Sequence, residues 1–232
     1  NEGYVVVKKF IRSTEIKKIK KSLLNYINKN RHSLTGRDIA VVKNTNKINS
    51  ISNLKNWAYI KQVQNKKKVK DLAKIFLGKK IKNFGSELFA KPAKVGLPAP
   101  IHQDNYYWNI LNGEGITVWI ALDNSNKKNG AVFYYKKSHK VGLLDHKLSK
   151  VRGLSQELKD KSILKKFKKN SPDLKSGDAL VHNCMIIHGS NKNLSKSSRT
   201  GLTMRFISSS SKFNTENKKK YELKLRKFLR KY

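Results

Sequence analysis

The sequence has a single cysteine, Cys184, so no disulfide bond can form within the chain. Cys184 lies inside an apolar run, which favours a reducing compartment, and we expect a cytoplasmic protein. No apolar run approaches the roughly eighteen residues of a membrane span, and the first residues lack the apolar stretch of a secretory signal. These absences predict a soluble globular protein.

Acidic residues are also scarce, because 15 Asp and Glu stand against 52 Lys and Arg, for a formal net charge of +37. Such an excess normally indicates a nucleic acid, an anionic membrane or an acidic substrate as partner. Only eight of the basic residues are Arg, however, and the chain is also rich in Asn and Ile. Proteins that bind phosphates with planar, bidentate contacts favour Arg. A coding bias toward Lys, Asn and Ile therefore explains the charge, and we expect no specific nucleic-acid partner.

Apolar periodicity predicts one domain over residues 1–232, since this length supports a single large core. Residues 1–83 show mainly helical periodicity, although residues 33–60 give no firm assignment. From residue 84 to 210 the period is two, which is typical of an all-β core. A Lys- and Arg-rich helix with an apolar stripe is predicted over residues 214–232, and we favour its packing against the parent domain or a second subunit over binding to a membrane or nucleic acid. We expect a monomer or homodimer.

Two of the predicted strands, 116–122 and 199–207, have an aliphatic face and a partly polar face. An aliphatic outer face covered by helices, with a partly polar inner face, is typical of a barrel or jelly roll with a ligand cavity inside. An ordinary sandwich with the aliphatic side chains inward remains the alternative. Asn129-Gly130 predicts a hairpin turn before a strand at 131–135. The polar, weakly helical stretch 138–172 predicts a long excursion of the kind that often covers a site.

The residues that carry chemistry begin with His102 and Asp104, a His-x-Asp pair at the start of the β region. In an extended strand, residues i and i+2 point to the same side, so both side chains can reach one ion. A second histidine would complete a triad of two histidines and one carboxylate, which leaves coordination positions of iron open. We choose His188, which precedes Gly-Ser, and keep His182, with the same strand parity, as the alternative. A capping or surface role of His102 is the competing interpretation.

Arg199 follows His188 by eleven residues and lies on the polar face of its strand. A guanidinium there can hold the distal carboxylate of 2-oxoglutarate through two charge-assisted hydrogen bonds, whereas a surface ion pair is the alternative. Arg205 shares this face and is expected to bind a substrate anion or to pair with a buried carboxylate. Tyr106 and Trp108 are candidate substrate contacts or core residues. The remaining histidines receive no role: His32, His139 and His146.

Six segments, in their order and spacing, resemble the phytanoyl-CoA dioxygenase family: Pro100-Ile-His-Gln-Asp-Asn-Tyr-Tyr-Trp108, Thr117-Val-Trp-Ile-Ala-Leu-Asp123, Asn129-Gly130, Ser138-His139-Lys140, Gly177-Asp178, and His188-Gly-Ser190 through Arg199. The resemblance covers residues 84–207, and residues 1–11 also look like that family's N-terminal segment. It implies a mainly β fold with flanking helices, a cupin-like double-stranded β-helix, or jelly roll.

The resemblance implies iron(II) held by His102, Asp104 and His188, with 2-oxoglutarate as cosubstrate and dioxygen as oxidant. It implies that the distal carboxylate of the cosubstrate is bound by further residues: Arg199, Ser190, Trp119 as a wall, and Gln103 as a neighbour. The implied activity is hydroxylation of an organic substrate, with release of succinate and carbon dioxide. Because the excess positive charge is diffuse lysine, which attracts anions, we expect this substrate to be a small molecule that carries an anionic group. The rival interpretation is a degenerate jelly roll that binds nucleic acid through its basic surface.

Overall fold

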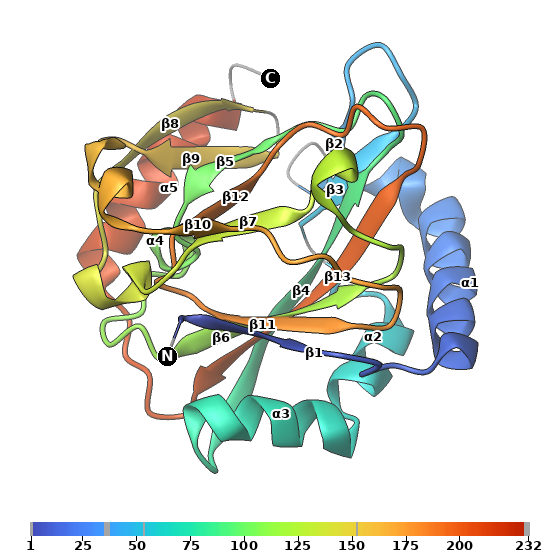
Figure 1. The fold of residues 1–232 in the computed structure, drawn as a ribbon, viewed down its shortest axis with the longest axis horizontal. Coiled ribbons are helices and arrows are strands. Elements are labelled where there is room, and N and C mark those ends of the chain that lie inside the picture. Colours follow the sequence, from blue (N-terminus) through green and yellow to red (C-terminus); the bar gives the residue numbers. More distant parts are fainter. Residues whose placement is uncertain (1, 35–37, 53, 152, 230–232) are drawn as a thin grey trace.

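The computed structural model describes residues 2–34, 38–52, 54–151 and 153–229, which form two antiparallel sheets flanked by helices (Figure 1). The larger sheet has the order β1 (Tyr4–Val7), β11 (Ala179–Asn183), β6 (Gly115–Ala121), β13 (Arg199–Ser208), β4 (Ile81–Lys91), β3 (Ile48–Ile51) and β2 (Ile39–Val41). The smaller sheet has the order β10 (Lys169–Asn170), β7 (Val132–Tyr135), β12 (His188–Ser190) and β5 (Ala99–His102). A hairpin of β8 (His146–Val151) and β9 (Leu154–Leu158) lies beside β5.

Helices α1 (Ser13–Asn30), α2 (Ala58–Gln64) and α3 (Lys67–Leu77) cover the outer face of the larger sheet. Ile19 of α1 and Val69 of α3 belong to the same buried cluster as Val118 and Ile120 of β6. The aliphatic face of these strands therefore points outward under helices, as predicted, and the sandwich alternative is wrong. The opposite face of the sheet, with its polar side chains, is left to line an internal cavity.

The predicted helical part, residues 1–83, also contains three strands of the larger sheet. β1 pairs with β11, while β2 and β3 extend the sheet beyond β4. Each of these strands has only three or four residues, which is too short for a clear period of two. Residues 33–60, which had no firm assignment, thus contribute sheet residues and buried core side chains such as Ile51 and Leu54.

Two connections differ from the sequence prediction. Residues 179–187 are a strand-like run in the sequence, but they are divided between the sheets, because β11 ends at Asn183 and β12 begins at His188 in the other sheet. Asn129-Gly130 ends a short 3₁₀ turn, Lys127–Asn129, that carries the chain from β6 to β7 in the other sheet and is therefore not a hairpin turn. The Asn126 side chain accepts hydrogen bonds from the backbone of this turn, and Gly130 leaves it with a φ of 82°.

The excursion 138–172 is not weakly helical but contains the β8–β9 hairpin, β10 and two 3₁₀ turns, Ser138–Val141 and Ser162–Lys166. Its strands escape detection by hydrophobic periodicity because β8 exposes three of its six residues and the buried positions of β9 include the polar residues Ser155 and Gln156. The basic C-terminal helix is α5 (Thr215–Leu229). It packs against the short helix α4 (Asn105–Trp108).

Contacts of α5 show that this helix packs against its own chain. The ring of Tyr221 lies 5.7 Å from that of Tyr107, and Lys224 Nζ donates to Tyr106 Oη at 2.8 Å. Of the predicted apolar stripe, Tyr232 lies outside the described residues, as do the side chains of Phe228 and Leu229. Among the described helices, none has the length and apolarity to cross a membrane.

Candidate metal centre

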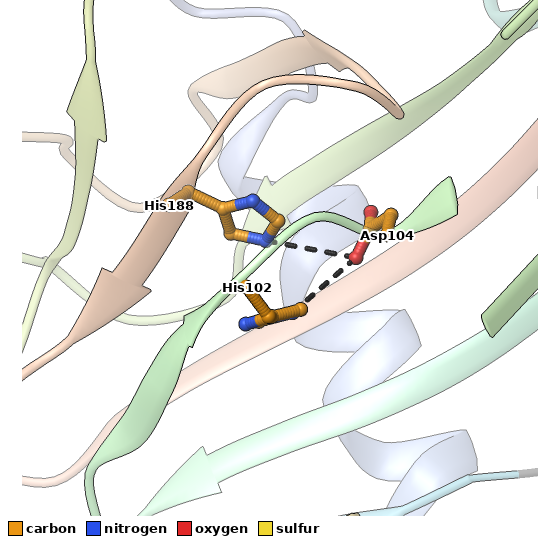
Figure 2. A group of neighbouring side chains, drawn as sticks. All are labelled: His102, Asp104 and His188. Carbon is orange, nitrogen blue, oxygen red and sulfur yellow. Dashed lines mark ion pairs between the residues drawn. The ribbon is translucent and has the colours of Figure 1, made fainter. Parts of the chain in front are cut away.

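Three predicted ligands converge where the two sheets meet (Figure 2). His102 at the end of β5 and His188 at the start of β12 are register partners across the smaller sheet, with ring centroids 4.3 Å apart. Asp104 follows at the turn into α4, and its Oδ1 lies 3.5 Å from His102 Nε2 and 3.6 Å from His188 Nε2. The three ligand atoms lie within 4.8 Å of one another, a separation that one ion between them can span.

Both histidines are held in the tautomer that a metal requires. His102 Nδ1 lies 2.7 Å from the carbonyl oxygen of Pro100, and His188 Nδ1 lies 3.0 Å from that of Ile186. A carbonyl only accepts hydrogen bonds, so each Nδ1 carries the proton and each Nε2 presents a lone pair to the centre. Burial lowers the pKa of His188 to about 3, which keeps its ring neutral at physiological pH. Two neutral imidazoles and a carboxylate on one side of a site are the donor set of an iron(II) oxygenase.

The second oxygen of Asp104 is already occupied by protein donors. Thr117 Oγ1 donates to Oδ2 at 2.8 Å, and His182 Nε2 contacts the same oxygen at 3.0 Å. His182 Nδ1 in turn lies 3.0 Å from the hydroxyl of Tyr134. Burial opposes ionisation of Asp104, but the surrounding histidines hold its pKa well below the ordinary value. His182, the alternative ligand, therefore orients the carboxylate from behind, while Oδ1 remains free for a metal.

A buried cation without a counterion lies in the same cavity. Arg199, at the start of β13, is 1% exposed, and no carboxylate of the described residues comes within 4.0 Å of it. Its Nη2 donates to the carbonyl oxygen of Gly130, its Nε is buried without a partner, and its guanidinium lies 5.4 Å from the ring of Trp119. Burial lowers the pKa of Arg199 to about 10, so the group stays charged at neutral pH. Ser190 also lines this cavity, which thus fits an anionic group such as the distal carboxylate of 2-oxoglutarate.

Lys91 of β4 is a second buried basic residue at this end, and it is the register partner of Arg199. Its Nζ donates to the carbonyl oxygens of Leu97 and Asn191. Burial, together with the charge of Arg199, lowers its pKa to about 6. Lys91 therefore ties two loops at this end of the cavity, and the arginine is the main fixed positive charge there at neutral pH.

The sequence profile of a family described as phytanoyl-CoA dioxygenase (PhyH) matches residues 1–201. The chain belongs to the phytanoyl-CoA dioxygenase family. Among curated relatives, it is 36% identical over 80 residues to a probable alpha-ketoglutarate-dependent hypophosphite dioxygenase of Stutzerimonas stutzeri, covering 34% of this chain and 28% of the relative. It is 27% identical over 142 residues to the peroxisomal phytanoyl-CoA dioxygenase of Mus musculus, covering 58% and 41%. The chain thus matches less than half the length of each of these two relatives.

The fold of this phytanoyl-CoA dioxygenase family member also matches solved structures. A crystal structure of EctD from S. alaskensis with 2-oxoglutarate and 5-hydroxyectoine superposes with a TM-score of 0.75 at 20% identity, covering 92% of this chain and 74% of that chain. The ectoine dioxygenase of Sphingopyxis alaskensis is 22% identical over 209 residues, covering 83% of this chain and 68% of the relative. The jelly-roll fold expected from the sequence is thereby confirmed.

Gln103, which the family resemblance placed beside the cosubstrate, is fully buried and faces away from the cavity. Its amide nitrogen donates to the carbonyl oxygens of Gly142 and Met185, and its amide oxygen accepts from Leu144 N. These bonds use both N–H donors of the amide, so Gln103 fastens the excursion over the site and has no free N–H donor for the cosubstrate. His146, to which no role was given, supports it by accepting a hydrogen bond from the Gln103 backbone N–H at 3.0 Å.

The three candidate substrate residues differ in their position. Tyr106 stacks on His146, with ring centroids 4.2 Å apart, and Trp108 packs edge-on against Phe84; neither side chain lines the cavity. Arg205 does line the cavity, where it meets Glu87 of β4. Sequence reasoning missed Glu87, although it has the same strand parity as Lys91 and so points to the same face of β4.

Proposed function

We propose that the chain is an iron(II)- and 2-oxoglutarate-dependent dioxygenase that hydroxylates a small organic substrate. The observation that carries this proposal is the convergence of His102 Nε2, His188 Nε2 and Asp104 Oδ1 in the same cavity as the buried Arg199, which has no ion pair with any described residue. The cavity thus offers ligands for a metal and a cation for a dicarboxylate cosubstrate. Family membership agrees with this chemistry.

The residues divide the work of the reaction. His102, Asp104 and His188 would hold iron(II), and Arg199, Ser190 and Trp119 would bind and orient 2-oxoglutarate. When bound by these residues, iron(II) would supply the chemistry that activates dioxygen, so that one oxygen atom would enter succinate as carbon dioxide leaves and the other would enter a C–H bond of the substrate as a hydroxyl group. The hydrogen bonds from Thr117 and His182 keep the carboxylate of Asp104 in one orientation. The β8–β9 hairpin, held by Gln103, limits access of water to the cavity.

The test is formation of succinate from 2-oxoglutarate by the iron-loaded protein in air, with binding of iron(II) measured separately under nitrogen. We expect one iron site, and we expect Asp104→Ala to lose both iron and turnover while retaining the circular dichroism of the parent. Full iron affinity in Asp104→Ala would refute the proposed ligand set. Turnover that requires an oligonucleotide at physiological salt, with none from small molecules, would favour the nucleic-acid alternative.

The single buried cysteine supports a reducing compartment such as the cytoplasm as the place of this activity.

A further inference from the structure

Two charged side chains in the cavity are not needed for iron or for 2-oxoglutarate. Glu87 of β4 and Arg205 of β13 line the same cavity as the three candidate ligands. Arg205 Nη1 lies 3.3 Å from Glu87 Oε1, and the two side chains keep 19% and 20% of their surface accessible. They are therefore mostly buried, yet both can contact a molecule that enters the cavity.

The hydrogen-bonding capacity of this pair is almost entirely unused. A guanidinium has five N–H donors, and a carboxylate accepts about four hydrogen bonds. In the described part of the chain, neither group forms a side-chain hydrogen bond, and Arg205 Nε is buried without a partner. Buried polar groups in native proteins are nearly always hydrogen-bonded. Of the polar atoms of these two described side chains, Arg205 Nε is buried without a partner, and the remaining donors and acceptors stay accessible to a ligand in the cavity.

The surrounding structure holds the Arg205 side chain in place without accepting hydrogen bonds from its guanidinium. Phe84 and Trp108 each present a ring at 5.8 Å from its Cζ. Gly85, the register partner of Arg205 on β4, has a φ of 144°, and a Cβ atom there would collide with the guanidinium. Gly85 therefore leaves the space that Arg205 occupies, and two aromatic rings keep the guanidinium in position. This explains the place of Trp108, which acts on the cavity through Arg205.

Glu87 is fixed by the neighbouring strand and is sensitive to charge. Thr203 Oγ1 donates to the Glu87 carbonyl oxygen at 3.1 Å and accepts from its N–H at 3.2 Å, which sets the register of β4 on β13. Burial raises the pKa of Glu87 above its ordinary value, the charge of Arg205 opposes this effect, and Asp104 adds to it. A positive group beside Glu87 would therefore stabilise the ionised carboxylate.

The pair also lies beside the candidate metal centre. Arg205 is the register partner of Thr117 on β6, and Thr117 Oγ1 donates to the Oδ2 atom of Asp104 at 2.8 Å. A molecule bound by Glu87 and Arg205 would thus have its carbon atoms close to the three ligands, where a C–H bond must lie for oxidation.

We propose that Glu87 and Arg205 bind the substrate, and that this substrate is a small zwitterion whose ammonium group and carboxylate lie on the same or adjacent carbons, as in an α-amino acid. The inference rests on the function proposed above and narrows the anionic substrate expected from the sequence. An anion alone would contact Arg205 but be repelled by Glu87 and Asp104, and a cation alone would be repelled by Arg205. Opposite charges 3.3 Å apart match a ligand whose own opposite charges are similarly close.

The test uses the iron-loaded protein with sets of three compounds that share a carbon skeleton: an amino acid, the acid without its amino group, and the amine without its carboxylate. Substrate-dependent succinate formation and a product heavier by one oxygen atom are the readouts. We expect at least one amino acid to be oxidised, with both partners at least about tenfold weaker, since each lacks one charge-assisted contact. Equal or better turnover of a compound that lacks one charge, or no turnover of any amino acid at millimolar concentration, would overturn the inference.

Variants of Glu87 test whether this carboxylate binds the ammonium group of the substrate. Glu87→Gln should raise the KM of the active amino acid about tenfold or more, and it should lower the KM of the acid partner, because the repulsion between Glu87 and that anion is removed. Glu157→Gln on β9 is the matched control, because that carboxylate has a similar exposure of 22% but pairs with Lys161 outside the cavity. An equal effect of both variants, or an unchanged KM in a folded Glu87→Gln, would contradict the assignment. Should Glu87→Gln fail to fold, Glu87→Asp tests the same selectivity.

Calorimetric binding of iron(II) and then of 2-oxoglutarate, without substrate, distinguishes the two proposals. If both bind and amino acids are inactive, the zwitterion inference fails while the proposed function stands. If neither binds, the proposed function itself fails.

Discussion

Replacing Arg199 with lysine tests the cosubstrate pocket most directly. The substitution keeps the positive charge but removes the planar pair of donors that can hold a carboxylate through two parallel hydrogen bonds. Because Arg199 is 1% exposed and has no carboxylate of the described residues within 4.0 Å, little of its interaction with a ligand is screened by water. Truncating one partner of a buried charged contact costs about 2 to 4 kcal/mol. Lysine retains the charge, so we expect about 2 kcal/mol, or an approximately 30-fold weaker affinity for 2-oxoglutarate.

The assay is calorimetric titration of 2-oxoglutarate into iron-loaded protein under nitrogen, repeated as the half-saturating concentration during turnover in air. Arg205→Lys is the matched control, since it makes the same change six residues further along the same face of β13. We expect Arg205→Lys to leave 2-oxoglutarate affinity within about threefold of the parent, because Arg205 is assigned to the substrate. The reasoning is refuted if both variants weaken 2-oxoglutarate equally, or if Arg199→Lys binds it as the parent does.

Three further outcomes are expected. His188→Ala should lose iron(II), whereas His182→Ala should weaken it by only about ten- to a hundredfold, as removal of an outer partner of a ligand does; iron titration of both variants decides, and the reverse order would make His182 the ligand. Burial lowers the pKa of His146 to about 4 in the folded protein. As the pH falls, His146 is therefore protonated in the unfolded chain at a higher pH than in the folded protein, and the unfolding free energy should drop by about 2 kcal/mol between pH 7 and pH 5. Urea unfolding of the parent and of His146→Gln checks this, because the variant should lack that part of the pH dependence. Gly201→Ala should displace the ring of Trp119, which occupies the space of a Cβ at that position, and lower stability by about 1 to 3 kcal/mol; an unchanged thermal midpoint would contradict this packing.

The sequence predicted the parts of the fold that have a strong period. β6 and β13 have seven and ten residues and alternate cleanly, so their outward aliphatic faces were predicted before the helices were placed on them. The short strands β2 and β3 were missed, since a period of two needs more residues to be recognised. The Asn129-Gly130 turn was misinterpreted because Gly130 adopts the left-handed conformation that a hairpin would also need, whereas Asn129, which has a positive φ in a type I′ hairpin, does not have one here.

Prediction of the site had a similar limit. The spacing of His102 and Asp104 is local and needs only the geometry of an extended strand. The partners that make the site specific come from distant strands: Glu87 beside Arg205 is set by the register of β4 on β13, which includes a shift between Arg205 and Phe206. Such a shift depends on packing of both strands and leaves no periodic pattern in the sequence. The hydrogen bonds of Gln103 could not be predicted for the same reason, since its acceptors lie 39 and 82 residues away.

The pairing of β1 with β11 has a consequence for how the chain acquires its structure. Tyr4 aligns with His182, so the edge strand β1 has no partner until the distant strand β11 has also been synthesised. β4 likewise waits for β13, and the two histidines of the candidate metal centre meet only when the smaller sheet closes between β5 and β12. Folding dominated by such distant pairings is slow, and unpaired strands are open to association with other chains in the meantime. The large excess of lysine would keep nascent chains apart by mutual repulsion during this interval, a benefit that ends once the sheets have closed.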